Sequence, residues 1–514
     1  MMKKKLSLCT TLVIGASLLL SACGSNAAKS TNETASASPT SSASAGASAS
    51  PAALKPVELT WYTVGTPQKD QPAVMEEINK ILKEKINATL KLNVIDWGAY
   101  DDKMKVITST NENYDLAFTS SWANNYGGNV LAGAYVPLDD LLKKYGQDIL
   151  KQVPEKYWSA TKINGKIYGS LNYQTYYIAR GLVFNKGLVE KYNFDVKSVK
   201  KPSDLTPFLE KVKSGEPGMT GYLPAANPFP ELFNMETGFT IDAVQGNSLF
   251  PLMINVNDKN MKVFDGVESK EFMDLMKVYR DWYQKGYIRK DAVSLKDYKA
   301  EAKSGKYAVW TRGGGPGASE AATAEQGYPA VVVDSVPSYI NTGGVIATMT
   351  AISKTSKNPE RAMMLLDLLY SDKQLYRLLS DGIEGKHYKK VNDNTMEAIA
   401  DSGYAPGTNW EFGNMFNDYA SKGSPVTLDQ LKQLNDTSAT SPLLGFLYNP
   451  DSLKQEYAQV NAIMGEMIPA LMTGTVDPEI SIPKYVDRLK KAGLDKLTDD
   501  AQKQINDWKA ANGK

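Results

Sequence analysis

Hydrophobic and polar positions along 57–120 change their period several times, and each change marks a new element. Period-two alternation predicts a strand at 57–65, and further strands are expected at 88–95 and 114–120. Apolar side chains three and four residues apart predict helices at 72–86 and 100–109. This strand–helix–strand–helix–strand order favours parallel pairing through right-handed crossovers, so we expect an α/β sheet.

The first of these helices has a clear start. Asp70 is available as its N-cap, and Pro72 fits the first turn, where no backbone N–H is needed. The helical stripe consists of Val74, Ile78, Ile81, Leu82 and Ile86.

A tryptophan lies close to the end of each predicted strand. Open parallel sheets bind ligands at the carboxyl ends of their strands. Flat rings pack on the apolar C–H faces of sugars, while Asn, Asp and Ser side chains bond the hydroxyls. We therefore predict a carbohydrate site at these loops, with the candidate residues Trp61, Asp96, Trp97, Ser121, Trp122 and Asn124. One or two of the tryptophans also fit a core position, Trp61 most of all, because it shares a strand face with Leu59. A peptide or an amino sugar would use similar residues, and both stay open.

Later parts of the chain add five candidates. Tyr173 and Tyr177 lie in a tyrosine-dense stretch, and Trp310 and Arg312 lie at the end of a further predicted strand. Arg312 suits either an acidic sugar or a carboxylate of the protein. Trp410, in a loop-rich aromatic region, either projects into a cleft or covers the surface.

Two further patterns are helical or glycine-rich. Amphipathic periodicity predicts a helix at 271–288 and a helix pair at 482–508, whose charged positions indicate a solvated face. The glycines at 313–317 lack the Gly-Lys-Ser/Thr ending of a phosphate-binding loop, which disfavours nucleotide binding.

The N-terminal 55 residues read as a targeting segment and a tether. Three lysines followed by about fifteen apolar residues suit a secretory signal at 1–22 and are short for a membrane span. The following Leu-Ser-Ala-Cys resembles the lipobox of bacterial lipoproteins, which implies cleavage before Cys23 and acylation of its thiol. Residues 23–55 are dominated by Ala, Ser, Thr and Gly, too few apolar side chains to form a core, so we expect a disordered linker.

Charge and rare residues exclude several functions. The 58 basic and 57 acidic residues nearly balance, so nucleic acid is not expected as a partner, because phosphate binding needs a cationic surplus. The chain has two cysteines, Cys9 and Cys23, and one histidine, His387. That inventory disfavours a structural zinc site or a Ser-His-Asp or Cys-His catalytic set, so no cofactor and no metal are predicted. His387 fits a turn or a ligand contact better than catalysis.

Four segments together resemble one protein family. These are NGKIYGSLNY at 164–173, SGKYAVW at 304–310, GGVIATMTAISKTSKNPERAMMLLDLLYSD at 343–372 and GIEGKHYKK at 382–390. They are similar to the extracellular solute-binding lipoproteins of bacterial ABC importers, in particular a Paenibacillus- and Bacillus-type subgroup with a C-terminal domain of unknown function. The resemblance extends over most of 55–514.

The resemblance implies a periplasmic-binding-protein-like α/β fold, with two doubly wound lobes, a hinge and a cleft between them. Lobe 1 would comprise 56–172 plus 338–372, and lobe 2 would comprise 173–337 plus 373–514. Chain crossings are expected near 172–176, 338–342 and 371–373.

The same resemblance implies what the protein does and where it works. It would capture a solute, expected to be an oligosaccharide, by lobe closure and deliver it to the membrane permease of an ABC importer. It would act as a monomer, anchored in the lipid bilayer through Cys23 on the extracellular face of the cell membrane of a Gram-positive-type bacterium.

Two alternatives remain at the level of sequence. A glycan-active enzyme would need two carboxylates facing one glycosidic bond, and Asp96, Glu411 and Asp418 are candidates by position. An adhesive or structural surface lipoprotein is the other.

Overall fold

The computed structural model describes residues 54–224, 229–244, 251–295 and 297–513. The predicted signal at 1–22, Cys23 and nearly all of the linker at 23–55 lie outside these residues.

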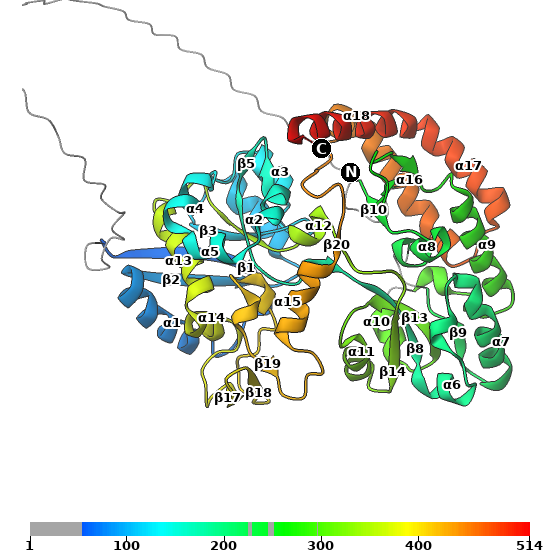
Figure 1. Cartoon of the computed structure of the whole chain (residues 1–514), viewed down its shortest axis with the longest axis horizontal. Coiled ribbons are helices and arrows are strands. Elements are labelled where there is room, and N and C mark those ends of the chain that lie inside the picture. Colours follow the sequence, from blue (N-terminus) through cyan, green and yellow to red (C-terminus); the bar gives the residue numbers. More distant parts are fainter. Residues whose placement is uncertain (1–53, 225–228, 245–250, 296, 514) are drawn as a thin grey trace, which may run out of the picture. The chain divides into compact units, whose positions relative to one another are not determined.

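The first sheet has five strands in the order β2-β1-β3-β16-β6 (Figure 1). Their bounds are β1 Val57–Val64, β2 Ala88–Ile95, β3 Leu116–Thr119, β6 Gly169–Leu171 and β16 Met349–Ile352. β1 pairs in parallel with β2 and β3, whereas β16 runs antiparallel to β3 and β6. The three predicted strands and their parallel pairing are confirmed.

Helices α1 Gln71–Ile86 and α2 Tyr100–Ser109 connect these parallel strands, as the periodicity predicts. Pro72 lies in the first turn of α1, but the Asp70 side chain makes no capping hydrogen bond. Its carboxylate instead lies 2.5 Å from the Lys386 ammonium. That hydrogen-bonded contact, together with His387, lowers the pKa of Asp70.

The two faces of the first sheet are covered differently. Leu59 and Trp61 of β1 belong to a large core that includes α1 and the helices α4 Asp139–Tyr145, α5 Gln147–Gln152, α13 Pro359–Ser371 and α14 Lys373–Ser380. On the other face, Met104 and Ile107 of α2 form a smaller core with Phe118 of β3. Residues after 372 also belong to the large core, including Tyr376, Leu379 and Phe412. The sequence-based division assigned them to lobe 2.

A second set of sheets forms a separate core. Its four-stranded sheet has the order β14-β8-β13-β9, with β8 Arg180–Asn185, β9 Thr220–Tyr222, β13 Tyr307–Gly313 and β14 Ala330–Asp334. A three-stranded sheet consists of β10 Ile241–Ala243, β11 Leu252–Asn255 and β12 Phe264–Asp265. The surrounding helices are α6 Lys186–Lys191, α7 Thr206–Gly215, α8 Phe229–Thr237, α9 Lys270–Gln284, α10 Tyr298–Lys303, α11 Ala318–Gln326, α16 Lys454–Met472, α17 Pro478–Lys491 and α18 Leu494–Asn512.

The amphipathic helices predicted from periodicity are present in this second part. α9 buries Phe272, Leu275, Met276, Tyr279 and Trp282 on one side. α17 and α18 form the predicted terminal pair, and they bury Leu489 and Leu497 against α16.

Three short strands join the two cores. β7 Tyr177–Ile178 pairs with β15 Tyr339–Ile340, and β15 pairs with β20 Ala439–Thr440. We call these three strands the connector sheet. β15 lies within the crossing expected near 338–342, and β7 directly follows the one expected near 172–176. The third expected crossing, near 371–373, is wrong, because 371–373 joins α13 to α14 within the first core, and β20 supplies the third connector strand.

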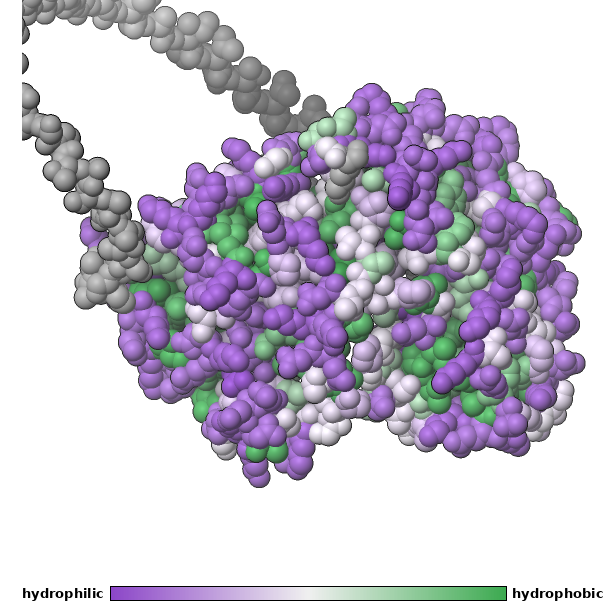
Figure 2. All heavy atoms as spheres, in the orientation of Figure 1, coloured by the Kyte–Doolittle hydropathy of each residue, from purple (hydrophilic) through white to green (hydrophobic). Residues whose placement is uncertain are grey.

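The remaining short α-helices and strands lie around these sheets. They are α3 Tyr126–Leu131, α12 Thr342–Val345, α15 Leu428–Thr437, β4 Lys162–Ile163, β5 Lys166–Ile167, β17 Tyr388–Asn392, β18 Thr395–Ala398 and β19 Ala420–Ser421. Hydrophilic residues cover most of the face drawn in Figure 2, with hydrophobic ones in small areas among them. In the part of the chain that the structure describes, no helix has both the length and the apolar character needed to cross a membrane.

Candidate functional site

Three tryptophans from different loops meet beyond the carboxyl ends of the parallel strands of the first sheet. Trp97 follows β2, Trp122 follows β3, and Trp410 lies in the short helix η6 Asn409–Glu411. The three ring centroids are 6.1 to 6.3 Å apart in every pairing. Trp97 and Trp122 are 45% and 49% exposed, and Trp410 is half-buried. We call these three residues the tryptophan cluster.

The cluster has a rigid base. The ring of Phe118 lies 5.6 Å from Trp122 and 6.0 Å from Trp410, and belongs to the core under α2. The indole N–H of Trp122 donates to the carbonyl of Ala347 at 2.7 Å. The Thr348 hydroxyl donates to the carbonyl of Trp410 at 2.9 Å. These contacts hold the Trp122 ring and the Trp410 backbone in place before any ligand arrives, which lowers the entropy cost of binding.

Glu411 lies directly after Trp410 and is buried. The Thr63 hydroxyl donates to its Oε2 at 2.7 Å, while Oε1 is buried with no hydrogen-bond partner among the described residues. Burial raises the pKa of Glu411 to about 8, so the side chain is protonated at neutral pH. A buried, neutral carboxyl contributes no charge to the cluster above it.

The predicted polar residues of these loops take different positions. Ser121 and Asp96 are exposed, and the Asp96 carboxylate accepts the backbone N–H of Gly98 at 3.1 Å. Asn124 is buried, and its amide donates to the carbonyl of Phe118 at 2.7 Å. Asp96 and Ser121 therefore remain available to a solute, whereas Asn124 mainly holds its loop in place.

Three predicted contacts need correction, because their residues are almost completely buried. Trp61 is 0% exposed and packs edge-on against Phe412 in the first core. Tyr173 is 1% exposed and packs against Phe416, and Trp310 is 1% exposed in the core beside β13. A side chain enclosed by the protein cannot stack on a sugar, so we assign all three to the core.

Tyr177 and Arg312 are intermediate cases. Tyr177 is half-buried in the connector sheet. The Arg312 guanidinium lies 3.5 Å from the carboxylate of Glu325 and donates to the carbonyl of Ala318. Of the two roles open to Arg312, the structure therefore shows the pairing with a protein carboxylate.

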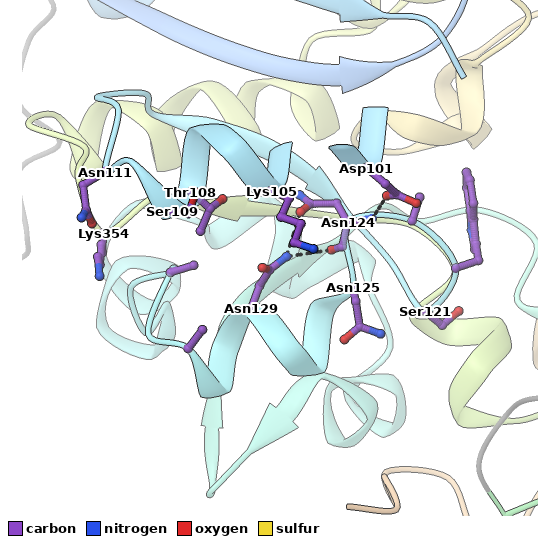
Figure 3. A pocket seen from close by; sticks show the side chains of 14 residues that line it. Asp101, Lys105, Thr108, Ser109, Asn111, Ser121, Asn124, Asn125, Asn129 and Lys354 are labelled. Atoms are coloured by element: carbon purple, nitrogen blue, oxygen red, sulfur yellow. Dashed lines mark hydrogen bonds between the residues drawn. The ribbon is translucent and has the colours of Figure 1, made fainter. Parts of the chain in front are cut away.

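A polar groove opens beside the tryptophan cluster and has a volume of about 590 Å³. Its side chains come from α2, from the loop after β3, from α3 and from the turn after β16. They include Asp101, Lys105, Asn111, Ser121, Trp122, Asn124, Asn125, Asn129 and Lys354. Figure 3 shows Ser121 at one end of the groove and Lys354 with Asn111 at the other. Trp122 belongs to both the groove and the tryptophan cluster.

Three buried residues that are not among the sequence-based candidates join the connector sheet to the second core: Asp242, Asn341 and Ser441. Asp242 of β10 accepts the Asn341 amide at 2.7 Å and the Ser441 hydroxyl at 2.6 Å. A small cavity of about 70 Å³ is lined by Asp242 and Asn341 together with Ser121. The signal that offered a clue was the Asn-Thr-Gly-Gly sequence at 341–344, in which Asn341 is the N-cap of α12.

Family membership follows from comparison with known proteins. Residues 65–375, more than half of the chain, match the family described as bacterial extracellular solute-binding protein. The chain belongs to that family. Residues 442–510, which include α16, α17 and nearly all of α18, match a domain of unknown function, DUF3502. Both parts of the resemblance predicted from sequence are confirmed.

Two related proteins support the same membership of the solute-binding family. A carbohydrate ABC transporter substrate-binding protein of Streptococcus pneumoniae serotype 4 is 29% identical over 463 residues, covering 88% of this chain and 91% of that protein. The lipoprotein LipO of Bacillus subtilis is 22% identical over 335 residues, covering 60% of this chain and 63% of LipO.

Solved structures confirm the predicted solute-binding-protein fold. The N-glycan transport solute-binding protein NgtS of Streptococcus pneumoniae matches with a TM-score of 0.78 at 28% identity, covering 88% of this chain and 99% of NgtS. Its complex with Man1GlcNAc matches with a TM-score of 0.69 at 27% identity over the same shares of the two chains.

Proposed function

We propose that this solute-binding protein captures an oligosaccharide at the tryptophan cluster and delivers it to the permease of an ABC importer. The observation that carries the proposal is the convergence of three tryptophans on one firm base, with Trp97 and Trp122 each close to half exposed. Indole faces match the apolar faces of pyranose rings, and the exposed Asp96 and Ser121 beside them suit sugar hydroxyls.

The relatives support a carbohydrate over a peptide ligand. The pneumococcal relative is named as a carbohydrate transporter subunit, and NgtS has been solved with Man1GlcNAc and Man5GlcNAc. A mannose–N-acetylglucosamine oligosaccharide is therefore the first ligand to test.

Capture would work by closure of two lobes around the solute. A ligand shifts such an equilibrium only through its greater affinity for the closed state, so both lobes must contribute contacts. We propose that the tryptophan cluster supplies the contacts of lobe 1 and that Tyr177, which packs against the first core from the connector sheet, contributes where the two lobes meet. The packing of Tyr376 and Phe412 supports an extension of lobe 1 beyond residue 372.

Anchoring is a separate part of the proposal. We infer that Cys23 becomes the acylated first residue of the mature chain and holds the protein, as a monomer, on the outer face of the cell membrane. The lipobox-like sequence supports this, as does the similarity to a lipoprotein of Bacillus subtilis.

The protein would bind without chemistry of its own. Two of the three carboxyls considered for glycoside hydrolysis are buried, Glu411 at 1% and Asp418 at 5% exposure. Asp418 also accepts hydrogen bonds from Ser380 and Asn409 inside the protein. A glycosidic bond needs two carboxyls that reach it from opposite sides, and these two are enclosed.

The test is a calorimetric titration of the chain without residues 1–22, carrying Cys23→Ala, with Man1GlcNAc to Man5GlcNAc. We expect saturable binding with no change in the sugar, as judged by chromatography of the recovered ligand. Released monosaccharide would contradict binding without chemistry. Absence of binding to this set and to neutral hexose oligosaccharides would contradict a carbohydrate ligand.

A further inference from the structure

The polar groove beside Trp122 has a chemistry of its own. We propose that it binds a second segment of the same glycan, an arm that carries a carboxylate group such as a uronic acid. This inference rests on the proposed function, because the arm would continue from a sugar held at the tryptophan cluster. Trp122 belongs to both places, so a bound chain passes from one to the other without leaving the protein surface.

The groove carries an excess of unpaired positive charge. Lys105 on α2 and Lys354 after β16 line it, and no described carboxylate lies within 4.0 Å of either ammonium. The one acidic residue among the lining side chains, Asp101, accepts the backbone N–H of Asn124 at 2.6 Å. Two cations facing one such carboxylate favour an anionic ligand over a neutral one.

Two asparagines that line the groove offer hydrogen-bonding groups. The Asn125 Oδ1 accepts the N–H of Gly128 at 2.6 Å, which leaves its amide N–H groups for a ligand. The Asn129 amide donates to Asn124 Oδ1 at 2.8 Å, which leaves the Asn129 Oδ1 as an acceptor. A sugar hydroxyl both donates and accepts, so this pair suits a saccharide better than a simple anion.

Size and arrangement also suit a saccharide arm. The volume of about 590 Å³ lies within the range of small-molecule sites, roughly 300–1,000 Å³. Lys105 and Asn129 lie between the Ser121 end and the Lys354 end in Figure 3, so an arm from the cluster passes both side chains before it reaches Lys354. All lining residues belong to elements packed on the first sheet, so lobe closure is not needed to form the groove.

The experiment compares matched pairs of glycans on the chain without residues 1–22, carrying Cys23→Ala. Each neutral oligosaccharide that binds in the first test is paired with its counterpart in which the terminal hexose is oxidised to a hexuronic acid. Affinities are measured by calorimetry at low and at high salt. Lys105→Gln, Lys354→Gln and the double variant remove the charges, and Lys103→Gln, exposed on the same helix outside the groove, is the control.

We expect at least one acidic member to bind about tenfold more tightly than its neutral partner at low salt, and the difference to shrink at high salt. The double variant should reduce this preference to less than twofold without changing neutral affinity, and Lys103→Gln should preserve it. Equal affinities within every pair, or a preference for the acidic glycan that the double variant retains, would overturn the proposal that the groove binds an acidic arm. Either result would leave the proposed function intact. If no neutral or acidic oligosaccharide binds, both proposals fail together.

Discussion

The indole ring of Trp97 stacks on that of Trp122, with the ring centroids 6.3 Å apart and the planes inclined by 21°. The two residues are separated by α2 and β3 in the chain, and each comes from a loop at a strand end. Because both rings remain close to half exposed, together they present more flat apolar surface than either does alone.

Removing this surface should weaken sugar binding strongly. We expect Trp122→Ala and Trp97→Ala each to lower affinity for the best neutral oligosaccharide by about 10-fold or more, because stacking area is lost. Calorimetric titration measures the change. Trp508→Phe on α18, which packs against Phe446, is the matched control and should bind like the unaltered protein. Affinities within twofold in both alanine variants would contradict a role for the cluster.

The support of Trp410 can be tested without touching its ring. Thr348→Val keeps the side-chain volume but removes the hydroxyl that donates to the Trp410 carbonyl and accepts from Asn172. We expect a loss of about 1 kcal/mol of stability and a several-fold loss of affinity, smaller than that of Trp410→Ala. Thermal unfolding and titration on the same samples separate the two effects. A larger affinity loss in Thr348→Val than in Trp410→Ala would contradict a role for the hydroxyl that acts only through the position of Trp410.

Glu411 should make the folded protein less stable as the pH rises from acidic to alkaline values. Its carboxyl keeps a proton up to about pH 8 in the folded protein, whereas an unfolded glutamate loses it near pH 4.5. The folded state therefore binds more protons between these values, and this contribution to stability is complete below pH 4.5 and lost as pH rises through 8. Glu411→Gln cannot ionise and should remove this loss.

The measurement is the melting temperature of Glu411→Gln and of the unaltered protein between pH 5 and pH 9. We expect similar values at pH 5 and an advantage of about 3 °C or more for the variant at pH 9. Glu397→Gln, at an exposed glutamate on β18, is the control and should show no such trend. If the melting temperature of Glu411→Gln exceeds that of the unaltered protein by the same amount at pH 5 and at pH 9, ionisation of Glu411 is not the cause.

Asp242 should stabilise the junction between the connector sheet and the second core. Asp242→Asn replaces one acceptor oxygen by an N–H₂ group that faces a donor, either the Asn341 amide or the Ser441 hydroxyl. An unpaired buried polar group costs about 1–3 kcal/mol, so we expect a clear drop in the midpoint of urea unfolding. Asp393→Asn, at an exposed carboxylate, serves as the control. An unchanged midpoint in Asp242→Asn would contradict this assignment.

Cys23 should determine location and not affinity. We expect Cys23→Ala to release the protein from the membrane fraction and to reduce sugar uptake by cells, because an acyl anchor needs the thiol. The oligosaccharide affinity of the purified protein should stay the same, since the site begins well beyond the linker. A variant that remains with the membranes would show that something other than this thiol anchors the chain.

The local pattern of side chains determined much of the first half of the fold. Period-two and helical spacing placed β1, α1, β2, α2 and β3 within a residue or two, because these elements bury a regular face in one core. The same pattern placed a tryptophan at the end of β2 and of β3, and composition pointed to the N-terminal signal. Trp61 was the ambiguous case, since a strand residue and a strand-end residue look alike in sequence.

Only the tertiary structure decided which aromatic residues have surface left for a ligand. Trp61, Tyr173 and Trp310 are enclosed, while Trp410 comes from a distant loop and joins Trp97 and Trp122. Burial depends on what packs from elsewhere in the chain, and residues more than 280 positions apart share no local pattern. For the same reason, neither the third connector strand nor the polar groove could be predicted from the sequence, since both depend on contacts between distant segments. The sequence determined the individual helices and strands, and tertiary packing decided how they are arranged.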